Sequence, residues 1–120
     1  MESGTQNELI KLLEKSDSLS NIQLYINKVL EIRKLNDQSP EKKMLLLTEE
    51  VGELAKAIRK EQTDMHIDLE GIDRYESISG EVADVLIVLL SLCNELGIDC
   101  YDALLSKERL NVKRTWMKES

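Results

Sequence analysis

The chain has 120 residues, which suits one small domain with a limited core. Its 23 acidic and 16 basic residues give a net charge of −7, which argues against general nucleic-acid binding because that needs a positive surface. The longest apolar run, residues 85–90, is far shorter than the about 20 residues of a membrane span, and residues 1–9 lack the apolar stretch of a secretion signal. We therefore expect a cytoplasmic protein with neither a membrane nor a nucleic-acid partner.

The spacing of apolar residues predicts an all-α protein in two parts. Residues 1–20 form an N-terminal extension with a short helix over 7–15, and residues 21–120 form the main helical domain. In that domain a helix is expected over 21–34, and a second begins at Pro40, where Ser39 is a good cap and proline suits the first helical position. This second helix runs to about residue 60 with one apolar stripe: Met44, Leu47, Val51, Leu54 and Ile58.

The second half of the chain begins with a long connection over residues 61–79, with a short helical turn near 74–78. A helix then runs over 80–96 and stops at Gly97, and Asp99 caps a last helix over 100–116. Residues 82–93 are apolar apart from Asp84 and Ser91, which predicts that this helix is buried on most sides.

Two short acidic motifs repeat one pattern. Glu50 and Glu53 flank Val51-Gly52, and Glu81 and Asp84 flank Val82-Ala83. Residues three apart share one face of a helix, so each helix should present two carboxylates to the same side. Four carboxylates brought together repel one another, and a hard divalent cation such as Mg²⁺ resolves that repulsion.

The alternative interpretation is that these acids are solvated or pair with lysine and arginine. A single motif of this kind is common by chance. The pair of motifs favours a metal site, and Asp84 favours it most, because a lone carboxylate in an apolar helix must be paired, protonated or bound to metal.

The motifs and their apolar flanks resemble the MazG nucleotide pyrophosphohydrolases, a family marked by ExxE, a spacer and then ExxD. Here the spacer is residues 54–80, and the resemblance covers about residues 21–116. It implies a four-helix-bundle-like fold, assembled as a homodimer or homotetramer, with residues 21–120 as the catalytic domain. It also implies Mg²⁺-dependent hydrolysis of nucleoside triphosphates to monophosphates and pyrophosphate, which Mn²⁺ could also support, in the clearing of aberrant nucleotides.

By motif match, Glu50, Glu53, Glu81 and Asp84 take the place of the family's metal ligands, and Glu50 or Glu53 would orient or deprotonate the attacking water. Lys107, Asn111 and Arg114 are spaced by four and three, so they should share one face of the last predicted helix. By the resemblance they match a set that contacts substrate phosphates. A solvated basic end of a helix explains these three residues equally well. Two other functions remain open, namely a phosphoribosyl-ATP pyrophosphohydrolase and a non-enzymatic helical oligomerisation module.

Overall fold

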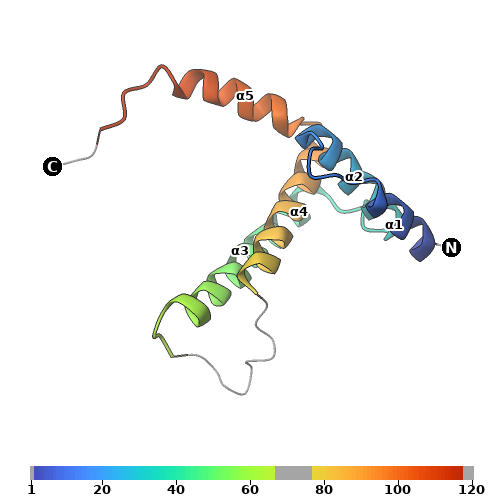
Figure 1. Cartoon of the computed structure of the whole chain (residues 1–120), viewed down its shortest axis with the longest axis horizontal. Coiled ribbons are helices and arrows are strands. Elements are labelled where there is room, and N and C mark those ends of the chain that lie inside the picture. Colours follow the sequence, from blue (N-terminus) through green and yellow to red (C-terminus); the bar gives the residue numbers. More distant parts are fainter. Residues whose placement is uncertain (1, 67–76, 118–120) are drawn as a thin grey trace.

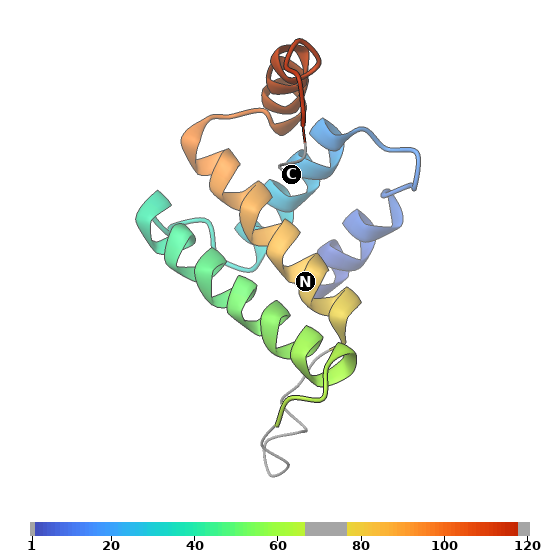
Figure 2. The same ribbon diagram turned by 90° about the vertical axis from the view of Figure 1, so that its left-hand side faces the viewer.

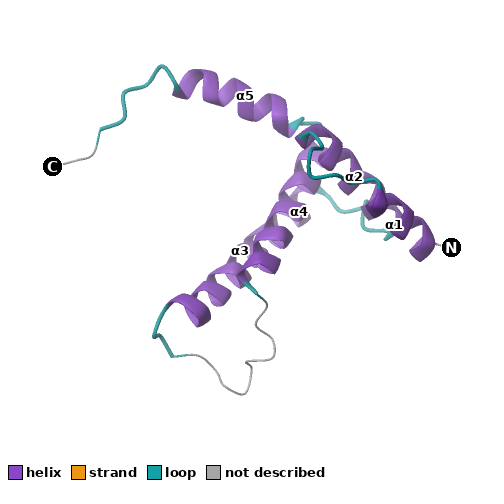
Figure 3. Cartoon of the chain, viewed as in Figure 1, coloured by secondary structure: helices purple, strands orange, loops and turns teal. Residues whose placement is uncertain are grey.

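The computed structural model describes residues 2–66 and 77–117, with side chains from residue 5 onward. Within these ranges the chain forms helices and no strand (Figure 3). The helices are α1 (Glu2–Lys11), α2 (Leu19–Ile32), α3 (Pro40–Gln62), α4 (Ile78–Leu96) and α5 (Cys100–Asn111). The predicted all-α class is confirmed, and none of the described helices is long and apolar enough to cross a membrane.

Side-chain caps explain where most of these helices begin. The hydroxyl oxygens of Ser18, Ser39 and Ser77 accept hydrogen bonds from backbone N–H groups in the first turns of α2, α3 and α4, at 3.1, 3.3 and 3.1 Å. Asp99 caps α5 in the same way through the Asp102 N–H group at 3.0 Å. Each cap satisfies a donor that the helix itself leaves without a partner. At the end of α4, Gly97 adopts φ +68°, a conformation that glycine tolerates best.

Two helices differ from their predicted ranges by more than two residues. The helix expected over residues 7–15 is α1, Glu2–Lys11, which starts five residues earlier and ends four earlier. The last helix ends at Asn111 and not near residue 116. Val112 and Thr115, which are β-branched and weak helix formers, lie just beyond that end. The helical turn expected near residues 74–78 falls largely outside the described residues.

The helices do not close into a compact body. α3 and α4 run antiparallel, side by side, and α2 packs across α4 (Figure 2). α1 lies on α2, while α5 packs against α2 and projects away from the α3–α4 pair (Figure 1). The radius of gyration is 17.6 Å, whereas a compact domain of this length has about 13–14 Å. Among the described residues the buried apolar core is correspondingly small: Ile26, Val29, Ala57 and Leu90.

The face of α3 that packs inward differs from the predicted stripe. Met44, Val51 and Ile58 are 50%, 49% and 42% exposed, whereas Lys43 and Ala57 are buried. The inner face of α3 therefore consists of residues 43, 47, 50, 54 and 57. Residues 43, 50 and 57 take the places of residues 44, 51 and 58 in the predicted stripe. The prediction that α4 is buried on most sides is also wrong for this chain, because Val82, Leu86, Leu89 and Leu96 are 40–52% exposed.

A buried amide joins α2 to the corner between α4 and α5. The Gln23 side chain is 6% exposed, and its Nε2 donates to Asn94 Oδ1 at 3.0 Å and to the Ile98 carbonyl at 2.6 Å. Its Oε1 accepts from the Cys100 N–H group at 2.9 Å, and Asn94 Nδ2 donates back to the Gln23 carbonyl at 3.1 Å. These hydrogen bonds fix the direction in which α5 projects from α2 and α4.

Candidate metal centre

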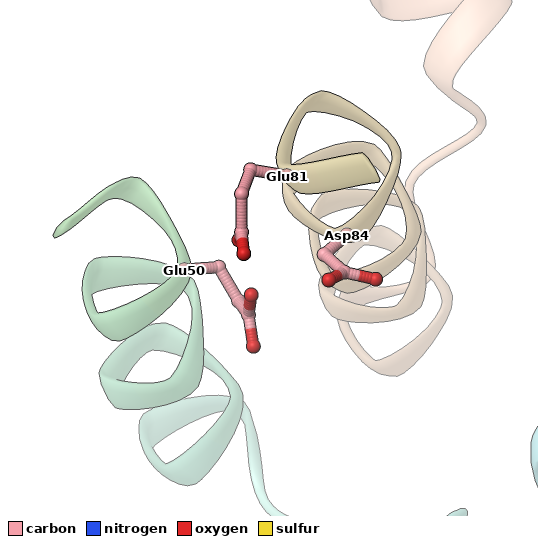
Figure 4. A group of neighbouring side chains, drawn as sticks. All are labelled: Glu50, Glu81 and Asp84. Atoms are coloured by element: carbon pink, nitrogen blue, oxygen red, sulfur yellow. The ribbon is translucent and has the colours of Figure 1, made fainter. Parts of the chain in front are cut away.

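Three carboxylates meet between α3 and α4. Glu50 extends from the middle of α3, and Glu81 and Asp84 extend from the first two turns of α4 toward it (Figure 4). One carboxylate oxygen from each residue lies within 4.8 Å of the other two. The spacing of three residues between Glu81 and Asp84 places both on one face of α4. The antiparallel packing of the two helices then brings Glu50 opposite them.

The three carboxylates differ in exposure. Glu81 is only 3% exposed, Glu50 is half-buried and Asp84 is exposed. The expectation that Asp84 is the buried charge of the site is therefore wrong for this chain, and Glu81 holds that place. Glu81 lies in the first turn of α4, where the positive end of the helix dipole stabilises a carboxylate. That position reduces the cost of burying it.

The neighbouring charges act on Glu50. Its burial raises its pKa above the ordinary value, and the negative charges of Asp84, Glu53 and Glu49 raise it further. A carboxyl group with such a pKa gives up its proton more readily when a cation binds beside it, because the cation relieves both effects. Three clustered carboxylate oxygens with an exposed side match what Mg²⁺ requires, namely a few oxygen ligands and room for water.

Glu53, the fourth predicted ligand, lies outside this cluster. Its side chain is 45% exposed, and its Oε2 lies 3.6 Å from Nζ of Lys56 on the same helix. Exposed pairs of this kind contribute little stability, so the pairing does not fix the carboxylate in place. Glu53 remains one helical turn from Glu50, near enough to raise the pKa of Glu50.

The predicted phosphate-binding residues lie on and beyond α5. Lys107 is exposed, and Asn111 is the last residue of the helix. Arg114 comes after the helix, with its guanidinium 4.7 Å from the centre of the Trp116 ring. The expectation that all three share one helical face is therefore wrong for Arg114. None of the three belongs to the carboxylate cluster, because α5 projects away from α3 and α4 (Figure 1).

A cavity of about 220 Å³ lies beside Asp84, between the end of α2, α3 and α4. Lys43 and Ser91, which are 3% and 4% exposed, form part of its wall. Neither residue belongs to a motif that marks it in the sequence. The available signal was their position, since Lys43 lies seven residues before Glu50 and Ser91 seven residues after Asp84, which places each on the same helical face as the acid.

The family model of the MazG nucleotide pyrophosphohydrolase domain matches residues 38–110. The chain belongs to the MazG nucleotide pyrophosphohydrolase family. The MazG match contains α3, α4 and the connection between them, and therefore the whole carboxylate cluster. α1 and α2 precede it, and Asn111 and Arg114 lie just beyond its end. No curated protein and no solved structure matches the chain. MazG domains are metal-dependent, which agrees with a cluster of acids on the two matched helices.

Proposed function

We propose that this MazG-family chain is an Mg²⁺-dependent hydrolase that converts a nucleoside triphosphate, ribo or deoxy, to the monophosphate and pyrophosphate. The observation that supports this most is the meeting of Glu50, Glu81 and Asp84 within 4.8 Å on the two helices that the family match covers. Glu53 completes the proposed ligand set from one turn further along α3. Mn²⁺, which also accepts carboxylate ligands, would be a substitute. The proposed role is the clearing of aberrant nucleotides.

A bound Mg²⁺ would neutralise phosphate oxygens and orient a water molecule for in-line attack. The carboxylates of the chain would hold the cation and accept a proton. Glu81 and Asp84 would hold the cation from α4, and Glu50 or Glu53 would accept the proton of the attacking water. The water oxygen then bonds to the α-phosphorus as the bridging bond to the β-phosphate breaks, and pyrophosphate leaves with the bridging oxygen.

The exposed apolar side chains favour assembly with a second copy of the chain. On α4, Val82, Leu86, Leu89 and Leu96 follow the spacing of four, three and seven residues that is typical of a helix–helix seam. On α3, Met44, Val51 and Ile58 repeat every seven residues. A chain with so small a core and two such exposed stripes would gain stability by covering them. We propose a homodimer, or a homotetramer of paired dimers, in which these stripes are covered.

Assembly also bears on the proposed phosphate contacts. About 18 Å of helix separates Asp84 from the end of α4, because each residue adds about 1.5 Å, and α5 then leads further away. A lysine or arginine side chain does not span that distance. We therefore propose that Lys107, Asn111 and Arg114 reach the phosphates at the carboxylate cluster of the partner copy.

We also propose that residues 21–120 form the catalytic domain and that residues 1–20 are an N-terminal extension to it.

Pyrophosphate release tests the activity. The purified chain is incubated with Mg²⁺ and a panel of ribo- and deoxynucleoside triphosphates together with phosphoribosyl-ATP, and pyrophosphate and orthophosphate are measured separately. Glu81→Gln should abolish pyrophosphate release, whereas Glu95→Gln, an exposed acid on the same helix, should leave it unchanged. Release of orthophosphate alone, or equal rates in both variants, would contradict the proposal, and inactivity on the whole panel would favour a non-enzymatic module.

Mixing two inactive variants tests the shared site. Glu81→Gln and Lys107→Ala are expressed separately, combined and allowed to exchange subunits. If each site takes α4 from one copy and α5 from the other, the mixed dimer has one intact site, and a two-fold symmetric assembly should regain about a quarter of the wild-type rate. No recovery despite demonstrated subunit exchange would refute the contribution from the partner copy.

A further inference from the structure

The cavity beside the carboxylate cluster has apolar walls. Leu30, Leu46, Ile87 and Val88 contribute them from α2, α3 and α4, and the polar side chains of Arg33 and Gln38 also line the cavity. Its volume of about 220 Å³ is well above the roughly 10–15 Å³ that admits one water molecule. Apolar walls with a few polar groups are typical of a site for a flat organic ring. Asp84, a member of the carboxylate cluster, lines the same cavity, so a ligand inside it lies next to the proposed metal.

The far end of this cavity is polar. Lys43 Nζ donates a hydrogen bond to Ser91 Oγ across the α3–α4 interface, and both residues are almost completely buried. Lys43 precedes Glu50 by two turns on α3, and Ser91 follows Asp84 by two turns on α4. The two helices are antiparallel (Figure 2). Seven residues at about 1.5 Å each therefore place the Lys43–Ser91 pair about 10 Å along the helix axes from the Glu50–Asp84 level.

Only part of the hydrogen-bonding capacity of Lys43 is used. A lysine ammonium carries three donors and no acceptor, and the bond to Ser91 takes one of them. No carboxylate among the described residues forms an ion pair with Lys43. Burial of a charged group is costly unless partners compensate it. Since Ser91 Oγ accepts from Lys43, its own hydrogen is available to donate, so this end of the cavity offers donors to a ligand.

We propose that Lys43 is a specificity-determining residue that selects nucleotides whose base carries a carbonyl oxygen at the edge farthest from the sugar. The proposal rests on the proposed function, which places the phosphates at the carboxylate cluster and the base deeper in the cavity. Thymine and guanine present O4 and O6 at that edge, and uracil and hypoxanthine do the same, whereas cytosine and adenine present amino groups. An amino group would face the Lys43 ammonium donor to donor and leave both without an acceptor.

Two pairs of substrates isolate this contact. dUTP differs from dCTP, and dITP from dATP, by the exchange of one amino group for an oxygen at the relevant position, with a hydrogen added to the adjacent ring nitrogen. We expect the wild-type chain to favour the carbonyl member of each pair by at least about tenfold in kcat/KM, within the range that one well-formed base contact provides. In Lys43→Met the preference should fall to within about threefold of unity, because methionine fills a similar volume and donates no hydrogen bond.

Matched variants separate recognition from structure. Lys42→Met removes the same charge at an exposed position next to Lys43 and should keep the wild-type preference. Ser91→Ala retains the ammonium but removes its partner, and should reduce the preference at least threefold. If Lys43→Met does not fold, as judged by circular dichroism, Ser91→Ala decides the question. A purely structural Lys43 would lower the melting temperature of the variants and leave the dUTP to dCTP ratio unchanged, which would overturn the proposal.

Failure of the proposed function gives a different result. If the wild-type chain hydrolyses none of the four nucleotides, the proposed activity is wrong, and the recognition proposal is then judged by calorimetric binding of the α,β-imido analogues of dUTP and dCTP. Tighter binding of the dUTP analogue that disappears in Lys43→Met supports recognition by Lys43. Equal binding of the two analogues, or no binding of either, refutes it.

Discussion

Replacing Glu50 by glutamine should make the chain more stable without metal and less stable with it. One carboxylate oxygen of Glu50 lies within 4.8 Å of one from Glu81 and one from Asp84. Burial raises the pKa of Glu50 most, and the charges of Asp84, Glu53 and Glu49 raise it further. At that distance each pair of charges repels by about 1 kcal/mol in the dielectric of water and by about 3.5 kcal/mol at an effective dielectric of 20. Asp84 is exposed and Glu81 is buried, so removing the Glu50 charge should raise the unfolding free energy by about 1–3 kcal/mol at pH 7.

Mg²⁺ should reverse this order. A ligand at one thousand times its dissociation constant stabilises the native state by about 4.1 kcal/mol, which exceeds the roughly 1–3 kcal/mol above, and the variant should lose most of that gain with the loss of a carboxylate ligand. Urea unfolding followed by circular dichroism, with and without Mg²⁺ at one protein concentration, measures both effects. Glu49→Gln is the matched control, since Glu49 is exposed, has the same charge and is the smallest contributor to the Glu50 shift. An equal Mg²⁺ response in Glu50→Gln and wild type, or a less stable variant without metal, would refute the electrostatic account.

Three further predictions concern stability. A methyl group at Gly52 would meet no atom within 4 Å, so Gly52→Ala should stabilise the chain by about 1 kcal/mol through helix propensity, and a lower urea midpoint would contradict this. Gln23→Leu should lower the free energy of unfolding by about 3 kcal/mol, because it leaves the Cys100 N–H and Ile98 carbonyl groups without their hydrogen bonds. Asn27→Ala, at an exposed position on the same helix, should lower it little. Equal losses for the two variants in urea unfolding would refute this role of Gln23. Hydrogen bonds from the Asp102 N–H group and then from the Ser20 hydroxyl lower the pKa of Asp99 in the folded chain. The contribution of Asp99 to the free energy of unfolding is therefore complete above the ordinary pKa of 3.8 and is lost as the pH falls through the lower folded pKa. The difference in unfolding free energy between wild type and Asp99→Ala, measured in urea from pH 7 to pH 3, should shrink with acidification, and a constant difference would contradict this.

The features that could be predicted from the sequence are those that neighbouring residues determine. Ser39 followed by Pro40 marks the start of α3, and Gly97 marks the end of α4, because capping depends on a few adjacent backbone groups. The ends of α1 and α5 were not predictable in this way, since no strong stop signal follows either helix. Polar residues that continue a weak helical pattern allow the helix to fray at several positions.

The part of the acidic site that lies on one helix could also be predicted, because its geometry depends only on residues close in the sequence. The spacing of Glu81 and Asp84 is enough to place both on one face, and the helix geometry guarantees it. Which acid of α3 meets them depends on the rotation of α3 about its own axis, and Glu50 and Glu53 differ by about 60° around that axis. Tertiary packing sets this rotation, so the sequence could not show that Glu50 faces α4 while Glu53 turns toward Lys56.

The rotation of α3 also explains why most of its predicted apolar stripe does not face the core. The helix carries an inner face with Lys43, Glu50 and Ala57, and an outer stripe with Met44, Val51 and Ile58. The outer stripe is the more apolar of the two, so a prediction that places the most apolar face in the core selects it. That rule assumes that the core lies within one chain. If the outer stripes of α3 and α4 instead meet a second copy, the polar inner face is free to hold the carboxylates and Lys43, and the apolar outer face provides the stability that the small core of the single chain lacks.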